Sequence, residues 1–317
     1  MTESVAHHRS SIRPHLALIA VQLMFSTWPI VGKIALRSFP STGLVALRVA
    51  GAAIAFIIIR HVTKRVPITR QSDYFRLALF SLLGVTLNQL LFVKGLSLST
   101  VVNATLLGTA IPVFTLLVSI VLGKERTSLR SVCGISLATC GVIYLVDPMR
   151  ADFSADKTLG NLLLVANTAF YGAYIALSQD MVRRYGALTV ITWMFAFACV
   201  ITTPIGGYYL AQMPMHDFGP ELWLAVLYII LVPTVAAYYL NAWALARVPP
   251  SIVSAYIYLQ PLIAFAIAPL LLGDEEKWGF RTAIAALLIF VGVAVATWRT
   301  ASSAVREVSE HPEALGH

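Results

Sequence analysis

Long apolar runs separated by short polar turns dominate the pattern along the chain. A helix needs about 20 consecutive, mostly apolar residues to cross the hydrocarbon core of a bilayer. Runs of that length recur along the whole chain, and they lack a polar face because a helix surrounded by lipid is apolar all round. The predicted helices cover approximately residues 14–36, 42–62, 74–97, 100–122, 129–147, 159–181, 188–212, 220–245, 250–273 and 278–299.

Composition supports the same interpretation. Of the 317 residues, 58% are hydrophobic and 12% are charged, whereas soluble domains carry about 25% charged residues. A soluble core cannot hide this much apolar surface, and the loops are too short to hold a separate domain. The first run is also too long for a removable signal peptide. We therefore predict an all-α integral membrane protein with ten transmembrane helices and the lipid bilayer as its surroundings.

The net charge of +8 is expected for a membrane protein and does not indicate a nucleic-acid partner, because Lys and Arg gather in cytoplasmic loops. Counted over alternate loops, fifteen of these residues fall on one side of the predicted membrane and five on the other. The bias predicts that both tails, residues 1–13 and 300–317, are cytoplasmic. We expect a multi-pass protein of the cell (inner) membrane.

The two halves of the chain carry the same marker residues at nearly equal spacing. Leu96 precedes Pro112 by 16 residues, and Leu245 precedes Pro261 by the same 16. These patterns predict two five-helix repeats, residues 14–147 and 159–299. Five crossings per repeat would insert the second copy upside down, and inverted repeats allow a central site to open to either face in turn. The markers that follow are Gly123, Arg130 and Gly141 in the first half and Gly273, Arg281 and Gly292 in the second.

Several short motifs join these markers into one pattern. They are Trp28 to Lys33, Ala46-Leu47-Arg48, Pro112 with Gly123-Lys124-Glu125 and Gly141, and Pro261 with Gly273-Asp274-Glu275 and Gly292. On these residues the chain resembles the EamA-type ten-helix carriers of the drug/metabolite transporter superfamily over about residues 15–298. This resemblance implies the drug/metabolite transporter fold, with helices one, three, four, six, eight and nine around a central cavity. It also implies export or exchange of amino acids and similar metabolites.

Three basic residues, Lys33, Arg48 and Lys94, fall inside or at the ends of predicted helices toward the non-cytoplasmic side. A charge at the centre of a helix costs at least about 2.5–3.5 kcal/mol, so each needs a partner or a function. Structurally, the two lysines would extend to the membrane surface and Arg48 would bind backbone carbonyls. Functionally, the three would form a positive vestibule for a carboxylate or another anion.

No Asp or Glu lies in the interior of a predicted span, and the histidines lie in the tails or near span ends. Proton-coupled carriers commonly use a buried carboxylate or histidine, so we expect facilitated diffusion or exchange. The cysteines Cys133, Cys140 and Cys199 lie in apolar runs without metal-binding spacing. We expect no metal, no cofactor and no enzymatic activity, since a catalytic cluster at a shared depth is missing.

Amides and aromatic rings recur near the middle of the predicted cavity helices. An amide in lipid must find a hydrogen-bond partner and so faces the bundle, either joining helices or binding substrate. Tyrosine rings could stack on apolar groups or face an ammonium. Asn167 and Tyr239 belong to this group, and Pro112 and Pro261 are predicted helix kinks, as bending points or plain packing features. The predicted substrate-binding residues are Arg48, Asn88, Gln89, Phe92, Tyr171, Tyr174, Tyr238, Asn241, Tyr258 and Gln260.

The sequence therefore predicts an alternating-access exporter or exchanger of small metabolites, namely amino acids or related amphipathic compounds. The alternative is an obligate antiporter of phosphorylated or nucleotide-linked metabolites. Such a carrier would favour cations facing the cavity in both halves, whereas the cations inside predicted spans are confined to the first half. A monomer and a homodimer are both compatible with the pattern.

Overall fold

The structure is a computed structural model that describes residues 12–63, 67–123, 129–146, 156–213, 218–248, 250–273, 279–292 and 294–295. Across these residues it contains helices and turns and no strand, so the all-α prediction is confirmed there. The two tails lie outside the described residues, and so do several loops whose Lys and Arg were counted for the charge bias. The loops that hold Lys124-Glu125 and Asp274-Glu275 are among them.

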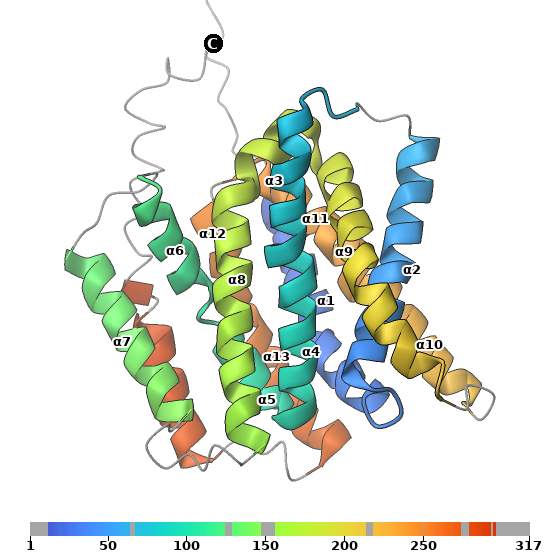
Figure 1. Ribbon diagram of the computed structural model, residues 1–317. Coiled ribbons are helices and arrows are strands. Elements are labelled where there is room, and N and C mark those ends of the chain that lie inside the picture. Colours follow the sequence, from blue (N-terminus) through green and yellow to red (C-terminus); the bar gives the residue numbers. More distant parts are fainter. Residues whose placement is uncertain are drawn as a thin grey trace, which may run out of the picture.

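The long helices stand side by side and roughly parallel, with α7 at one edge of the bundle and α2 and α10 at the other (Figure 1). A further apolar helix covers Phe280–Gly292. Shorter π or 3-10 turns join some of the α-helices: η1 (Leu82–Leu87), η3 (Leu231–Ala236) and η4 (Tyr256–Tyr258). The α-helices are α1 (Ile12–Ala35), α2 (Ser41–Val62), α3 (Gln71–Ser81), α4 (Asn88–Leu98), α5 (Val101–Gly108), α6 (Ile111–Val121), α7 (Leu129–Val146), α8 (Asp156–Tyr185), α9 (Ala187–Leu210), α10 (Pro220–Ile230), α11 (Ala237–Leu245), α12 (Pro250–Ala255) and α13 (Leu259–Leu272).

Seven helical stretches in the described part of the chain are long and apolar enough to cross a membrane. Two shorter apolar helices, Val132–Gly141 and Phe280–Gly292, fall within the fifth and tenth predicted spans. The ninth predicted span is divided among α12, η4 and α13. The seven stretches are Ile12–Ala35, Ser41–Val62, Gln71–Leu98, Val101–Val121, Lys157–Tyr185, Ala187–Leu210 and Pro220–Leu245.

The bundle places apolar side chains outside and polar ones inside. Ile54 and Ile58 on α2 and Leu224 on α10 are more than half exposed, whereas Arg48 and Asn88 are buried. This arrangement is expected in lipid, which accepts apolar side chains on the surface and forces polar groups to find partners inside the protein.

Two π-helical turns interrupt long helices at positions 149 residues apart, η1 between α3 and α4 and η3 between α10 and α11. In η3 the cause is Pro233, which lacks a backbone N–H and cannot sit in a regular helix without displacing a carbonyl. The Thr234 hydroxyl donates to the Ile229 carbonyl oxygen at 2.7 Å. The widened turn therefore keeps that carbonyl paired.

Both predicted kink prolines follow a break in a helix. Pro112 lies in the first turn of α6, after the turn at Thr109 and Ala110 that ends α5. Pro261 is the third residue of α13, directly after η4. The first residues of a helix have no intrahelical partner for their N–H groups, so a proline there costs no hydrogen bond, and both prolines lie where a new helix begins.

The C-terminal ends of α4 and α11 are capped in the same way by the first helix of their own half. Lys33 Nζ donates to the carbonyl oxygens of Leu96 and Ser99. Gln179 Nε2 donates to Leu245 O at 3.2 Å and Val248 O at 3.1 Å. The acceptors correspond in pairs, since Leu245 follows Leu96 by 149 positions and Val248 follows Ser99 by the same number. Lys33 thus supplies donors to a helix end, a role that sequence analysis did not assign to it.

The helices α2 and α9 approach most closely at Gly206. A Cβ atom added there would overlap the Thr42 carbonyl oxygen and the Ala46 Cβ atom. At the next residue, Gly207, an added Cβ would meet nothing within 4 Å. Two adjacent glycines of one helix therefore differ in whether the fold requires them.

We expect Gly206→Ala to destabilise the protein by about 1–3 kcal/mol, because overpacked backbone must shift. Gly207→Ala is the matched control and should retain stability, since it adds the same methyl group on an open face. Thermal unfolding of the two variants in detergent measures the difference. Equal stability of the two variants would contradict this packing.

Candidate functional site

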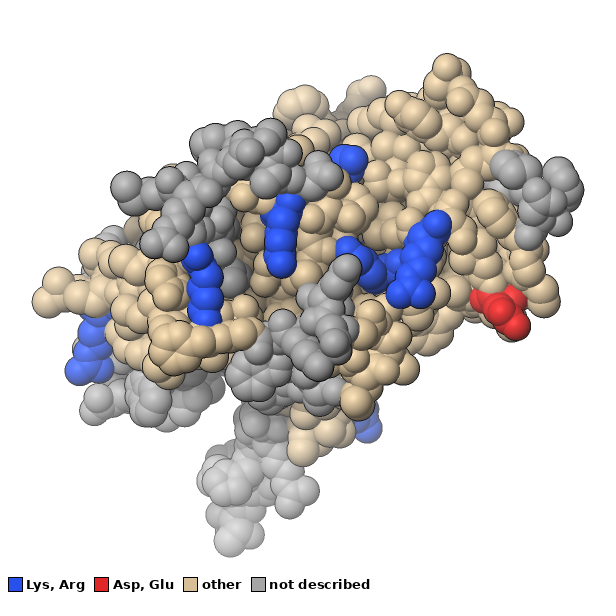
Figure 2. All heavy atoms as spheres, turned by 90° about the horizontal axis from the view of Figure 1, so that it is seen from below, with Lys and Arg blue, Asp and Glu red and all other residues tan. Residues whose placement is uncertain are grey.

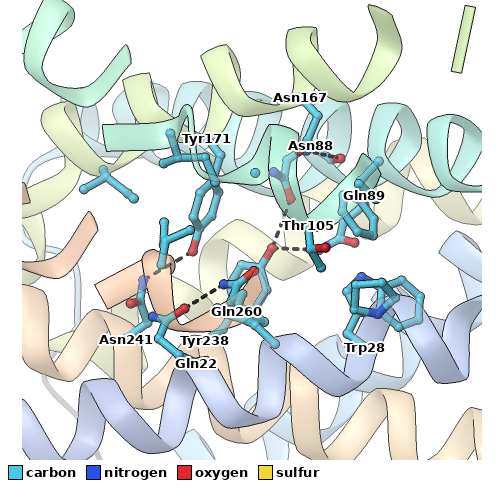
Figure 3. Close-up of a pocket in the computed structure, with 18 of the residues that line it drawn as sticks. Gln22, Trp28, Asn88, Gln89, Thr105, Asn167, Tyr171, Tyr238, Asn241 and Gln260 are labelled. Atoms are coloured by element: carbon cyan, nitrogen blue, oxygen red, sulfur yellow. Dashed lines mark hydrogen bonds between the residues drawn. The ribbon is translucent and has the colours of Figure 1, made fainter. Parts of the chain in front are cut away.

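A central cavity lies where helices of the N-terminal and C-terminal parts of the chain meet. The cavity is lined by side chains from α1, α2, α4, α5, α6, α8, α11, α12, η4 and α13. Figure 3 shows that amide and tyrosine side chains from facing helices point toward one another across this space.

Most of the predicted substrate-binding residues meet at this cavity, and so does Asn167. The structure adds residues from helices that sequence analysis searched less closely, among them Gln22 on α1 and Thr105 on α5. The sequence could have indicated both, since each is a polar residue inside an apolar run of a predicted cavity helix. The predicted residues that line the cavity are Arg48, Asn88, Gln89, Phe92, Tyr171, Tyr238, Asn241 and Gln260.

Two predicted tyrosines lie outside the lining. Tyr174 is buried, and its ring packs against Gly84, where an added Cβ would come within 2.6 Å of the ring. Tyr258 packs edge-on against Phe290 at 6.0 Å, and its hydroxyl has no hydrogen-bond partner in the described part of the chain. Tyr171 and Tyr174 are three residues apart, which leaves about 60° between them around the helix. That angle is enough to separate the two rings.

The predicted vestibule lysines also lie outside the lining. Lys33 caps α4, and Lys94 is exposed. Tyr239 is half-buried and packs against the apolar core beside the cavity. The structure thus brings Arg48 to the cavity and separates it from both lysines.

The Tyr238 hydroxyl is the centre of a hydrogen-bond network on α4 and α11 (Figure 3). Gln89 Nε2 donates to it at 2.7 Å. The hydroxyl faces Asn88 Oδ1 at 3.2 Å and the Gly84 carbonyl oxygen at 3.3 Å. Gln89 and Tyr238 lie 149 positions apart, the same separation as the two π turns. Corresponding positions of the two halves therefore touch at the centre of the molecule.

Three further amide contacts join helices around the cavity. Asn241 Nδ2 donates to the Tyr171 hydroxyl at 3.2 Å, and Gln260 Nε2 donates to Gln22 Oε1 at 2.6 Å. Asn167 Nδ2 donates to the Asn88 carbonyl oxygen at 2.8 Å. The amides join helices and also line the cavity. Their role in joining helices is therefore seen, and substrate binding by them stays a prediction.

Arg48 lies deeper than a vestibule residue, beside the network of Gln89 and Tyr238. Its guanidinium donates to Thr234 Oγ1, Gln89 Oε1 and the Pro233 carbonyl oxygen, the last at 3.2 Å. It also lies 4.0 Å from the centre of the Trp28 ring, a cation–π contact. The side chain is only 1% exposed. The π turn at Pro233 therefore supplies part of the site that holds this charge.

Arg48 is the only Lys, Arg, His, Asp or Glu among the residues that line the cavity in the described part of the chain. No group of His, Cys, Asp and Glu suited to a metal ion occurs among the described residues. A buried acid does occur at the start of α3, where Asp73 accepts from the Tyr185 hydroxyl at 2.7 Å and pairs with Arg184 at 3.3 Å. Asp73 lies just outside the predicted span and joins α3 to the end of α8.

Comparison with known proteins places these features in context. The model of the EamA-like transporter family matches the chain twice, over residues 12–146 and 158–298. An "Uncharacterized transporter" of Archaeoglobus fulgidus is 29% identical, with 71% of this chain and 77% of the relative aligned. The "Uncharacterized transporter YetK" of Bacillus subtilis is 24% identical over 88% of this chain and 86% of the relative.

A plant relative, the "WAT1-related protein At3g18200" of Arabidopsis thaliana, is 23% identical over 95% of this chain and 86% of its own length. A solved structure, named only as "Crystal structure of protein", superposes with a TM-score of 0.63 at 20% identity. The superposition covers 90% of this chain and 97% of that chain, which shows a shared fold.

We expect Tyr238→Phe to destabilise the protein by about 1–3 kcal/mol, because the buried Gln89 amide and Asn88 side chain both lose a partner. Tyr239→Phe is the control, as it removes the neighbouring hydroxyl outside the network. Thermal unfolding in detergent compares the two variants. A loss of stability no larger in Tyr238→Phe than in Tyr239→Phe would argue against the network as a stabilising element.

Proposed function

The chain belongs to the EamA-like transporter family, and we propose that it carries small amphipathic metabolites, such as amino acids or related compounds, through the central cavity. The observation that carries the proposal is the cavity itself, which combines amides and tyrosines with apolar side chains. Such a lining can hold a polar group at one end of a small molecule and an apolar body at the other. The relatives are likewise named as transporters.

We further propose that residues 14–147 and 159–299 are inverted five-helix repeats with ten crossings in total. The two matches of the family model support this division, as do the π turns 149 residues apart. The packing supports it too, since α1 lies against α11 and α8 lies against α4, each the first helix of one half against the third span of the other. Two similar halves around one cavity are the basis of alternating access.

The capped helix ends suggest how the halves would exchange conformations. Lys33 joins α1 to the end of α4, and Gln179 joins α8 to the end of α11. In an inverted arrangement these contacts lie at opposite faces of the membrane. Each cap would keep the first and third spans of its half together while the two halves move about the cavity.

The Lys and Arg bias supports cytoplasmic tails and an orientation in the inner membrane. Arg183 and Arg184 lie in the last turn of α8 and Arg60 lies in the last turn of α2, and both helices end at the top of the bundle in Figure 1. The opposite end also carries basic side chains, together with an acidic side chain at one edge, among uncharged residues (Figure 2). The basic residues of the proposed cytoplasmic end attract anionic headgroups and resist translocation.

An antiporter of phosphorylated or nucleotide-linked metabolites is the less favoured alternative. A phosphate dianion would need more than one cation or an arginine with several free donors. The described lining offers Arg48 alone, and three of its donors are already used.

Reconstitution into proteoliposomes with a panel of amino acids and related metabolites tests the proposal. We expect uptake of at least one panel member, and we expect Tyr171→Ala to raise its KM several-fold because the ring that faces the cavity is lost. Tyr208→Ala on the outer face of α9 is the control, since Tyr208 is 65% exposed. Absence of uptake across the panel, or equal effects of the two variants, would count against the cavity as the transport site.

We also expect a pH gradient alone to cause no accumulation, because the described cavity lining contains no carboxylate or histidine to relay protons. The same liposomes with and without an imposed gradient measure this. Accumulation driven by the gradient would refute uncoupled transport while leaving the carrier proposal intact.

A further inference from the structure

Among the residues that the structure describes, one full positive charge and no acid line the central cavity. Among the described residues, the buried acid Asp73 lies on the same long helix as Gln89, 16 residues earlier. At a rise of 1.5 Å per residue this is about 24 Å along the helix axis. Asp73 is also already paired with Arg184 and Tyr185. It cannot act as the counter-ion of Arg48.

The partners of Arg48 hold its charge without neutralising it. All three acceptors, Thr234 Oγ1, Gln89 Oε1 and the Pro233 carbonyl oxygen, are neutral dipoles, and so is the Trp28 ring. A guanidinium has five N–H donors, so these three bonds leave two donors. The site is therefore built to keep an arginine charged beside a cavity that has no anion of its own.

The rest of the lining gives little support to a second cation. The Trp28 face is occupied by Arg48. Three amide oxygens already accept hydrogen bonds: Gln89 Oε1 from Arg48, Asn88 Oδ1 from Tyr238 and Gln22 Oε1 from Gln260. An ammonium group in this space would face the field of Arg48 with no carboxylate to offset it.

We propose that the cavity selects organic monoanions, in particular a carboxylate joined to an aromatic or apolar body, over zwitterions and cations with the same skeleton. This inference rests on the proposed carrier function and moves its substrate class from zwitterionic amino acids to related organic anions. The carboxylate would pair with the Arg48 charge, as guanidinium groups pair well with planar carboxylates. The apolar body would lie against side chains such as Phe25, Ile111 and Ile257, which line the same cavity.

A charge series on one skeleton tests the selectivity. At pH 7, 3-phenylpropionate is an anion, phenylalanine is a zwitterion and phenethylamine is a cation, and all three carry a phenyl ring on a short carbon chain. Calorimetric titration of the purified full-length protein in detergent measures binding of each. We expect 3-phenylpropionate to bind about tenfold or more tightly than either of the others. Phenylalanine has the same carboxylate but brings an ammonium group into the field of Arg48, and phenethylamine has no carboxylate to pair with the guanidinium.

Two variants test whether the cavity charge causes the preference. Arg48→Gln removes the cation, and Asn241→Asp adds an acid to the lining while leaving Arg48 and its contacts in place. The Asp side chain can accept from the Tyr171 hydroxyl that Asn241 now contacts, so this variant is informative even if Arg48→Gln folds poorly. We expect both variants to lose the preference for the anion.

Arg60→Gln is the matched control, because Arg60 lies on the same helix, also faces a tryptophan (Trp193, at 6.0 Å) and lies outside the cavity lining. It should keep the wild-type preference. Binding of phenylalanine or phenethylamine as tight as that of the anion, binding of none of the three, or an unchanged preference in Asn241→Asp would overturn the inference. Uptake of the metabolite panel by proteoliposomes separately decides whether the protein is a carrier.

Discussion

In a lipid bilayer no water reaches the hydrocarbon core, so every polar group there must find its partner within the protein. The centre of this molecule follows from that requirement. Pro233 interrupts a helix, the Thr234 hydroxyl pairs with the displaced Ile229 carbonyl, and the Pro233 carbonyl is then available to Arg48. The contacts that keep the backbone paired are the same contacts that hold a charge beside the cavity. Fold and candidate site are therefore one hydrogen-bonded system.

The N-terminal and C-terminal parts of the chain keep their polar groups paired with similar helix breaks and different side chains. Each has a π turn at the same position and each has a capped third span, but the cap is a lysine in one half and a glutamine in the other. A helix end needs only a donor, so either residue serves. At the centre, Gln89 meets Tyr238 at corresponding positions. If the two parts are repeats, as proposed, they enclose a cavity whose described lining takes its charge from the first part alone.

Much of the cavity could be predicted because lipid restricts where amides can point. Asn88, Gln89 and Asn241 lie in the middle of apolar runs, and each faces the bundle as expected. Tyr174 could not be placed this way, since a tyrosine ring is stable against either a cavity or a neighbouring helix, and here Gly84 leaves room for it. The depth of the Arg48 guanidinium could not be predicted from the sequence either, because a long side chain can end more than one helical turn from its Cα atom.

The sequence by itself determined that the chain is a helical membrane protein, because length and apolar content are properties of each segment alone. It also located two helix breaks, before Pro112 and Pro261, since proline acts on its own backbone. Only the tertiary structure decided which polar groups meet. The contacts of Arg48 with Thr234, of Gln89 with Tyr238 and of Gln22 with Gln260 join residues 186, 149 and 238 positions apart. Periodicity cannot specify such pairs, because they depend on how distant helices pack around a shared cavity.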